Sequence, residues 1–252
     1  MTVDLHTHIL PGIDDGSPDL ETSLELLKKE EDNGVTTVVL TPHFRFEKQE
    51  IGPFLQQREA AYAQLKKAAE KVFPSLQLRL GAEVRYSTRI LEEESRALCM
   101  QNTGYMLVEF SVHHRPQFVE DVFYKLQLSG ITPVIAHVER YPYLEEKPEL
   151  LYEYVKAGAL AQVNAASITD YADRRRLIEK WAAHSLVHVV ATDTHHPGRR
   201  PPKLREAMAL LEAKLGKEQV AQMEQIAQMV VEDQELFLPE PEPIKRIFGF
   251  WR

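Results

Sequence analysis

The chain has 252 residues, 44% of them hydrophobic, which is the composition of a globular protein with a substantial core. Its formal net charge of −8 argues weakly against nucleic acid as a partner, because nucleic-acid-binding surfaces are basic. No segment approaches the ~20 apolar residues that span a bilayer, and a single cysteine, Cys99, excludes an internal disulfide framework. We therefore expect a cytoplasmic protein that does not insert into a membrane.

Predicted strands and helices alternate along the chain. Ser17, Pro18 and Asp19 are typical of a helix start, with serine as the N-cap, and Gly34 ends that helix. Strands are expected at residues 4–8, 36–40, 77–82, 105–108, 132–136, 160–163 and 187–191, and further helices at residues 53–73, 87–98, 116–128, 148–156, 170–183, 203–215 and 218–231. This alternation predicts parallel strands with right-handed crossovers. Seven strands, one fewer than in a TIM barrel, predict a distorted α/β barrel of the (β/α)7 type.

One domain is expected over residues 1–252, because barrels of this kind routinely reach that size. The first linker-like stretch is the proline-rich segment 238–243. Residues 239–252 are expected to form a C-terminal tail whose aromatic residues, Phe248, Phe250 and Trp251, pack on the barrel or, less favoured, on a neighbouring molecule. The sequence leaves open whether the chain forms homo-oligomers.

Residues of the metal-ligand type follow the predicted strands. His6 and His8 lie two positions apart, so alternation along an extended chain places both imidazoles on one side. The same pattern recurs along the chain at Asp15, His43, Glu83, Glu109, His137, Asp193 and His195. In βα barrels the carboxyl ends of the strands converge on the functional site. Nine ligands exceed the roughly four to six positions around one ion, so two or three ions are expected to share them.

The kinds of ligand indicate which metal and which reaction to expect. Imidazole and carboxylate without thiolate suit manganese, iron or zinc better than calcium or magnesium. Clustered divalent ions lower the pKa of a bridging water and clamp the attacking and leaving oxygens of an in-line displacement. Phosphoester hydrolysis by a hydroxide that bridges the ions is therefore the predicted reaction class, and amide hydrolysis is its competitor.

Several short segments carry motifs in a fixed order: Asp4-Leu5-His6-Thr7-His8, Asp14-Asp15-Gly16, Thr41-Pro42-His43, Gly81-Ala82-Glu83 and Val108-Glu109-Phe110. In these motifs the chain resembles the polymerase-and-histidinol-phosphatase (PHP) superfamily. Residues 132–141, and residues 191–195 followed by Arg200-Pro201-Pro202, are similar to the manganese-dependent protein-tyrosine phosphatases encoded with bacterial capsule and exopolysaccharide genes. The resemblance extends from Met1 to about Leu238.

The resemblance implies a centre of three manganese ions. The first ion would be held by His6, His8, Glu83 and Asp193, the second by Glu83, Glu109 and His137, and the third by Asp15, His43 and His195. It also implies that Arg140 and Arg200 bind the substrate phosphate, where a permanently charged guanidinium fork stabilises charge. The implied substrate is the phosphotyrosine tail of a membrane-associated bacterial tyrosine kinase that regulates capsular or exopolysaccharide synthesis.

Some assignments stay open at this point. Either Asp14 or Asp15 could be the metal ligand, and the family pattern favours Asp15. Either His195 or His196 could be the ligand, and alternation along the chain favours His195. Asn164 either orients a ligand or water or makes a buried hydrogen bond. Other candidates are expected to be structural or solvated: His113, His114, His184, His188, Arg45 and Arg115, the two arginines having an acidic peptide as their alternative contact.

The alternative functions are a small-molecule phosphatase such as histidinol phosphatase, a metal amidohydrolase and a metal-stabilised binding module. Cys99 is not followed by an arginine at the spacing Cys-x5-Arg, which thiol-dependent tyrosine phosphatases require. A buried, structural cysteine is expected instead.

Overall fold

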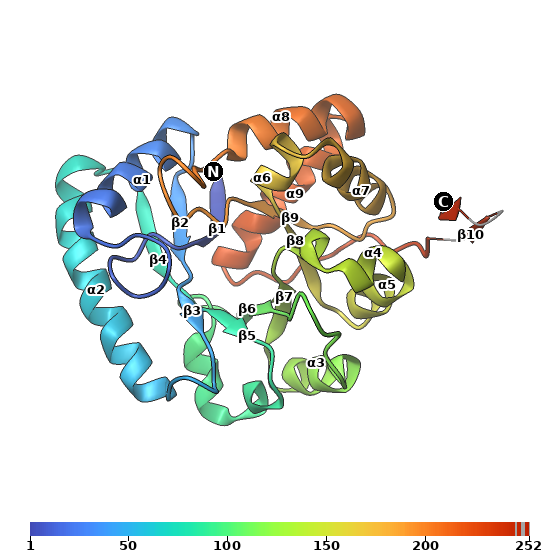
Figure 1. The fold of residues 1–252 in the computed structure, drawn as a ribbon, viewed down its shortest axis with the longest axis horizontal. Helices are drawn as coiled ribbons and strands as arrows, with labels where there is room; N and C mark the ends of the chain where they lie inside the picture. The colour runs from blue at the N-terminus through green and yellow to red at the C-terminus, as the bar shows by residue number, and fades with distance from the viewer. Residues whose placement is uncertain (245, 248–249, 252) are drawn as a thin grey trace.

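The computed structural model describes residues 1–244, 246–247 and 250–251. Parallel strands occupy its centre and helices surround them (Figure 1). The central strands are β1 Val3–Thr7, β2 Thr37–Leu40, β3 His43–Phe44, β4 Gln77–Leu80, β5 Glu83–Arg85, β6 Tyr105–Glu109, β7 Thr132–Ile135, β8 Leu160–Asn164 and β9 Val189–Ala191. They pair in the orders β1-β2-β4 and β3-β5-β6-β7-β8-β9, and every pair is parallel.

Two of the predicted strands are interrupted. β2 and β3 are two pieces of one strand position, separated around Pro42, and β4 and β5 are separated around Gly81. The two breaks are neighbours, since Gly81 N–H donates to the Leu40 carbonyl (2.8 Å) and Glu83 N–H to the Pro42 carbonyl (3.0 Å). Proline has no N–H to donate to a ladder, which accounts for a break at this position. With each interrupted strand counted once, the described residues form the seven positions of the predicted distorted barrel.

Hydrogen bonds between the first strand and the segment after the last one close the barrel. Asp193 N–H donates to the His6 carbonyl (2.8 Å), and His8 N–H donates to the Thr194 carbonyl (2.9 Å). Thr7 and Thr194 also form a parallel bridge. The closure places ligand-type residues from the two ends of the sequence side by side.

The helices are α1 Leu20–Asp32, α2 Ile51–Val72, α3 Val119–Leu128, α4 Pro142–Glu146, α5 Pro148–Lys156, α6 Ala165–Thr169, α7 Ala172–Ala183, α8 Leu204–Leu215 and α9 Lys217–Val231, with 3-10 turns η1 Thr88–Leu91, η2 Glu93–Leu98 and η3 Val138–Arg140. No described helix is long and apolar enough to cross a bilayer.

Two local predictions are wrong. Asp19, not Ser17, caps α1, because its carboxylate accepts the N–H of Thr22 (2.8 Å), whereas the Ser17 hydroxyl donates to the Asp19 carbonyl (2.8 Å). The helix expected over residues 87–98 is divided into η1 and η2 at Glu92, whose backbone is extended (φ −65°, ψ 142°).

Apolar side chains form two clusters on opposite faces of the strands. The smaller cluster fills the barrel with residues from six strands, among them Leu5 of β1, Val39 of β2 and Leu107 of β6. Ile226 and Val230 of α9 belong to the same cluster, so this helix covers the inner apolar layer. The larger cluster joins the outer faces of the strands to the surrounding helices. The inner layer supports the strands whose carboxyl ends carry the polar residues.

The segment after α9 returns along the barrel. Asp233 accepts the N–H of Gly104 (2.8 Å), and the carbonyl of Gln234 accepts the hydroxyl of Tyr105 (2.8 Å). The chain ends in an antiparallel pair, β10 Arg246–Ile247 and β11 Phe250–Trp251, at the periphery of Figure 1. The predicted packing of the tail aromatics, Phe248, Phe250 and Trp251, concerns side chains that lie outside the described residues.

We expect His188 to make stability depend on pH. Its imidazole is buried, Nδ1 accepts the N–H of Ala161 (3.0 Å), and burial lowers its pKa from 6.5 to about 4. As pH falls from 6.5 to 4, the unfolded chain binds a proton that the native state excludes, so about 3 kcal/mol of stability is lost across this window and is fully present above it. His188→Asn keeps an acceptor and does not titrate, so its unfolding free energy should fall less over the same range.

Denaturant unfolding at pH 7.5 and pH 4.5 measures this difference. His113→Gln, at an exposed histidine, is the matched control and should follow the wild-type pH dependence. An equal pH dependence in His188→Asn and wild type would contradict the prediction.

Candidate metal centre

A bulge in β1 aims the first two histidines into the barrel. Between its pairs with β2, β1 advances three residues from Asp4 to Thr7 while β2 advances only two, from Val38 to Leu40. One extra residue reverses the alternation beyond it. Leu5 therefore packs in the inner apolar cluster while His6 also faces inward, where its ring contacts Gln162.

The two imidazoles present their Nε2 nitrogens to the same point. His6 Nδ1–H donates to the Gln162 side-chain oxygen (3.1 Å) and His8 Nδ1–H to the Asp14 carboxylate (2.7 Å). In these tautomers both Nε2 atoms face inward, 3.1 Å apart. Against the effect of burial, Glu83 raises the pKa of His6 and Asp14 raises that of His8, so each Nε2 can hold either a proton or a cation. Two facing lone pairs repel unless a proton or a cation lies between them. An outward N–H bond with an inward Nε2 is also the usual arrangement of metal-ligating histidine, so these residues fit a metal ion.

The structure separates the roles of Asp14 and Asp15. Asp14 uses both oxygens locally, because Oδ2 accepts from His8 and from the N–H of His43 (3.0 Å) while Oδ1 accepts the N–H of Gly16 (3.0 Å). Asp15 Oδ1 instead faces the centre. Gly16 permits this turn, since a Cβ there would lie 2.1 Å from the His8 carbonyl oxygen. The geometry favours Asp15 as the ligand and gives Asp14 the task of orienting His8.

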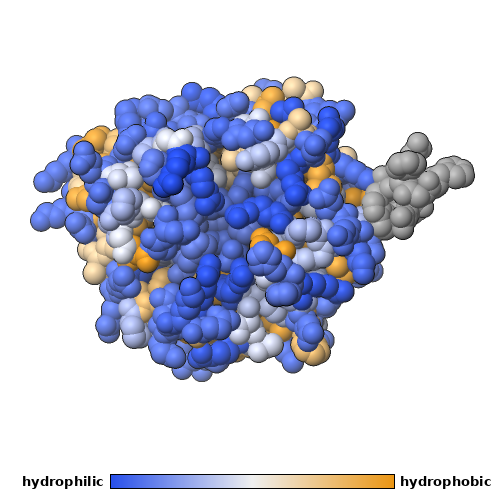
Figure 2. All heavy atoms as spheres, in the orientation of Figure 1, coloured by the Kyte–Doolittle hydropathy of each residue, from blue (hydrophilic) through white to orange (hydrophobic). Residues whose placement is uncertain are grey.

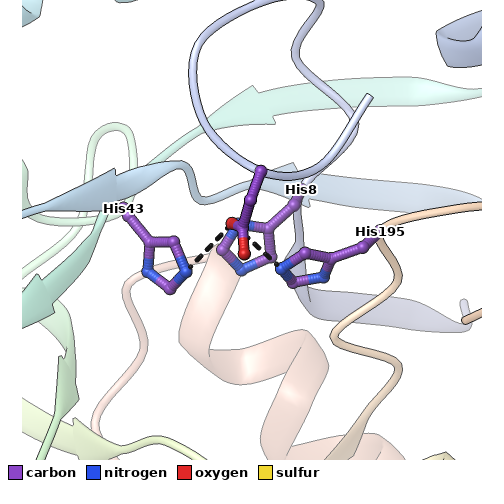
Figure 3. A group of neighbouring side chains, drawn as sticks. His8, His43 and His195 are labelled. Atoms are coloured by element: carbon purple, nitrogen blue, oxygen red, sulfur yellow. Dashed lines mark ion pairs between the residues drawn. The ribbon is translucent and has the colours of Figure 1, made fainter. Parts of the chain in front are cut away.

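A second group of side chains gathers around Asp15. Its Oδ1 lies 3.4 Å from His43 Nε2 and 3.5 Å from His195 Nε2. The rings of His8 and His195 lie close together, with centroids 3.9 Å apart and planes tilted by 31° (Figure 3). One ligand atom from each of these four residues lies within 4.8 Å of the others. His195 Nδ1–H donates to the Asp193 carbonyl (2.9 Å), which again leaves Nε2 for the centre.

Glu83 lies between the histidines. One oxygen, Oε2, is 2.8 Å from His43 Nδ1, 3.2 Å from His8 Nε2 and 3.4 Å from His6 Nε2, and the other, Oε1, is 2.9 Å from His137 Nε2. Oε2 is buried without a hydrogen-bond partner within the described residues. A central carboxylate with one unsatisfied oxygen is the arrangement that a bridging ligand requires.

Glu109 ends β6 beside this group. It joins His43 and Glu83 within 4.8 Å, and Arg85 of β5 contacts its carboxylate (2.9 Å). His137, expected in the same group, is not among these three; within the described part of the chain it contacts the group through Glu83. His6, His8 and Asp193 form the remaining close group. The structure thus brings all nine predicted ligands to one end of the barrel, although the close groups overlap and differ in part from the expected grouping.

Asp193 presents its two oxygens to different partners. Oδ1 faces the histidines, at 3.5 Å from both His6 Nε2 and His8 Nε2. Oδ2 accepts from Arg200 (2.6 Å), Asn164 (2.7 Å) and Arg140 (3.3 Å). The arginine side chains are 41% and 44% exposed, so each guanidinium retains N–H groups that can bind an anion from solvent. Both predicted phosphate-binding residues therefore lie at the edge of the metal centre.

Two of the predicted ligands have unusual backbones. His137 has φ 34° and Asp193 has φ 51°, values in the left-handed region that non-glycine residues seldom adopt. Such conformations cost about 1–3 kcal/mol and persist where the surroundings impose them. Here the turn at each residue follows a buried strand, β7 or β9, and points the side chain into the centre.

Four carboxylates of the centre have lowered pKa values and remain ionised near neutral pH: Asp14, Asp15, Glu83 and Asp193. Burial opposes their charge, but the positive charge of protonated His6 and hydrogen bonds from the neighbouring histidines hold the pKa of Glu83 well below its usual range, and the charges of His6 and Arg200 hold that of Asp193 low. Contact with His8 lowers the pKa of Asp14 to about 2 against the effect of burial. The centre is therefore rich in negative charge and in imidazole nitrogen, a donor set suited to a transition-metal cation.

Sequence reasoning missed Gln162. Its side-chain oxygen accepts from His6 Nδ1–H (3.1 Å) and from the N–H of His137 (2.9 Å), and its Nε2 donates to Asn164 (2.9 Å), which donates to Asp193. This chain fixes the tautomer of His6 and the position of Asp193. A glutamine inside an apolar strand was the available signal.

The remaining candidates are placed as follows. His196 Nδ1 accepts the N–H of Gly198 (2.9 Å) and faces its own loop, so His195 alone of this pair faces the centre. Cys99 is buried, and burial raises its pKa to about 11, which makes it an inert thiol. His113 and His114 lie exposed in a loop, and Arg115 pairs with Glu120 (3.8 Å).

Comparison with known proteins identifies the family. Residues 2–231 match the family described as capsular polysaccharide synthesis, CpsB/CapC. The chain belongs to this family. It is 34% identical to the tyrosine-protein phosphatase YwqE of Bacillus subtilis, over 99% of this chain and 100% of the relative, and 34% identical to the tyrosine-protein phosphatase CpsB of Streptococcus agalactiae, over 88% and 94%.

Solved structures agree with this assignment. One matches with a TM-score of 0.90 and 31% identity, over 97% of this chain and 100% of the other, and belongs to a report on YwqE from Bacillus subtilis and CpsB from Streptococcus pneumoniae as unique metal-dependent tyrosine phosphatases. A histidinol phosphate phosphatase from Lactococcus lactis shares the fold at 13% identity, with a TM-score of 0.52 over 84% of this chain and 93% of the other. At this identity the second match shows a common fold and no more.

We expect Gln162→Leu to weaken metal binding by about 10–100-fold, because His6 loses the acceptor that fixes its ring. Competition between the protein and a chelator for Mn²⁺ measures the affinity. Gln219→Leu, which removes a glutamine hydrogen bond to the Ala182 carbonyl away from the centre, is the control and should bind Mn²⁺ normally. Equal Mn²⁺ affinities in Gln162→Leu and wild type, with both proteins folded, would show that Gln162 does not support metal binding.

Proposed function

We propose that the chain is a manganese-dependent protein-tyrosine phosphatase, a phosphoric monoester hydrolase. The observation that carries this proposal is the position of Arg140 and Arg200, whose guanidinium groups both reach the outer oxygen of Asp193 at the edge of the metal centre. A phosphate placed there would contact both arginines and the centre together. Membership of the capsular polysaccharide synthesis family and the named activity of its relatives support the same function.

We infer three Mn²⁺ ions, with iron or zinc as alternatives. His6, His8, Glu83 and Asp193 would hold the first, Glu83, Glu109 and His137 the second, and Asp15, His43 and His195 the third. The close contacts of Asp15, His43 and His195 support the third site directly, and Glu83 supports a bridge because its oxygens face different histidines. Ions clustered in this way supply an activated water at neutral pH and neutralise charge on phosphate oxygens.

The residues of the chain supply binding and orientation. Arg140 and Arg200 would bind phosphate oxygens through paired N–H groups, and both stay protonated through the reaction. Asn164 and Gln162 hold Asp193 and His6 in place. Among the described side chains around the centre, each histidine and carboxylate already faces a ligand position or a partner, so none is free to protonate a leaving oxygen. A phenolate with pKa near ~10 leaves without such an acid far more readily than an alkoxide.

The proposed substrate is a phosphotyrosine tail of a membrane-associated bacterial tyrosine kinase that regulates capsular or exopolysaccharide synthesis, hydrolysed in the cytoplasm. We take residues 1–252 as one catalytic domain with residues 239–252 as its tail. The relatives named CpsB and YwqE support the phosphotyrosine substrate, and the family description supports the link to capsule synthesis.

Substrate choice and metal dependence test the proposal together. Protein loaded with Mn²⁺ should hydrolyse a phosphotyrosine peptide with a higher kcat/KM than histidinol phosphate, because the alkyl ester lacks a good leaving group. Chelation should abolish this activity, and Mn²⁺ should restore it better than Mg²⁺, which prefers oxygen ligands. A higher kcat/KM for histidinol phosphate would assign the chain to small-molecule phosphatases, and full activity without metal would exclude the centre.

Variants separate the arginine mechanism from a thiol mechanism. Arg140→Ala and Arg200→Ala should each slow hydrolysis by about ten- to a thousandfold, the scale of losing a charge-stabilising group. Cys99→Ser should stay within a small factor of wild type, since the thiol is buried and its pKa is about 11. Steady-state kinetics on a phosphotyrosine peptide measure both. An inactive, folded Cys99→Ser beside a fully active Arg200→Ala would refute the mechanism.

A further inference from the structure

A cationic cavity adjoins the phosphate-binding arginines. Its volume is about 480 Å³, and η3, α6, the start of α7 and the loop before α8 line it. The charged residues of its lining are Arg140, Arg174, Arg199, Arg200 and Lys203, with Asp170 as the single acid. The chain as a whole carries −8, so this concentration of positive charge is local. The middle of the face seen in Figure 2 is mostly hydrophilic.

The cavity is continuous with the proposed catalytic site. Arg140 and Arg200 belong to its lining and also contact Asp193 of the metal centre. Arg174 donates to the carbonyl of Glu139 (2.9 Å), and Glu139 directly precedes Arg140 in the chain. A substrate whose phosphate contacts Arg140 and Arg200 therefore has neighbouring groups beside Arg174 and the other cations.

Part of this positive charge is available to a ligand. Arg199 is exposed and makes no ion pair with any described residue; the contact at this position is its backbone N–H to His196. Arg174 pairs with Glu145 (2.8 Å) and Lys203 with Asp170, but both acids are exposed, at 53% and 40%. Exposed ion pairs are weak and exchange readily for another anion.

The shape of the lining favours a peptide. Tyr171, 62% exposed, lies at the cavity and offers an aromatic surface, and the arginine side chains remain partly open to solvent. An open cationic surface beside the proposed phosphate site can contact residues next to a phosphotyrosine. Guanidinium and ammonium groups here would bind carboxylate or phosphate.

We propose that this cavity is a second anion subsite, in which Arg199, Lys203 and Arg174 bind a negatively charged side chain flanking the scissile phosphotyrosine. The inference rests on the proposed function and adds a preference to it: acidic or multiply phosphorylated tyrosine peptides over neutral ones. The subsite acts on recognition of the peptide and not on the reacting phosphate.

Three peptides test this inference, each with one phosphotyrosine, flanked by glutamates, by glutamines or by phosphoserines. The Mn²⁺-loaded wild type should prefer the glutamate peptide over the glutamine peptide by about tenfold in kcat/KM at low salt, and the preference should shrink at high salt. In Arg199→Glu/Lys203→Glu the ratio of the two kcat/KM values should fall to one or below. Comparing kcat/KM for the glutamate peptide with kcat/KM for the phosphoserine peptide shows whether the subsite binds carboxylate or phosphate better.

Arg176→Glu, at a 71% exposed arginine of α7 outside the cavity, is the matched charge reversal and should keep the wild-type ratio. Arg199→Lys should retain most of the preference, because it keeps the charge. An unchanged ratio in the double variant, or no preference in wild type, would overturn the subsite while leaving phosphotyrosine hydrolysis intact. Hydrolysis of none of the peptides by wild type would overturn the proposed function and the subsite with it.

Discussion

The seam between the first and last strands is the interaction on which the metal centre depends. His6 comes from the first strand and Asp193 from the segment after the last, and the two meet because their backbones are tied there. Asp4 holds this seam, since one buried carboxylate oxygen accepts the N–H of His6 (3.2 Å) and the N–H of Thr192 (3.1 Å). A single oxygen thus fixes both strands immediately before their ligands, and a shift at the seam would displace ligands from both ends of the chain.

A second buried acid supports Asp4 from outside the barrel. Glu30 of α1 is fully buried, and burial followed by the charge of Asp4 raises its pKa well above its usual range. This shift favours the protonated carboxyl, which can share its proton with Asp4, and Glu30 Oε1 accepts the hydroxyl of Thr192 (3.3 Å). Burying two carboxyl groups without this shared proton would be costly. The first helix is thereby joined to the seam by hydrogen bonds in addition to apolar contact.

The sequence predicted the strands, their parallel order and the end of the barrel where the polar residues meet, because buried strands and the rule that carboxyl ends converge are properties of local pattern. It could not show the interruption at Gly81 or the bulge in β1, since both arise from pairing with a neighbouring strand. The separate tasks of Asp14 and Asp15 also depend on the turn at Gly16. Gln162 was missed because one polar residue in a buried strand does not indicate its partner.

Charge is divided sharply across Asp193. Its inner oxygen belongs to a centre of carboxylates and imidazoles that suits cations, and its outer oxygen faces Arg140 and Arg200, which suit anions. Without a phosphate, the outer oxygen balances the two guanidinium charges. A substrate phosphate brings negative charge of its own and competes for the same N–H groups, while a cation at the inner oxygen draws the carboxylate the other way. Metal and phosphate should therefore favour each other's binding through Asp193. A cation at the inner oxygen weakens the contact of the outer oxygen with the two arginines, which frees their N–H groups for phosphate. A phosphate on the arginines in turn releases Asp193 to bind the cation.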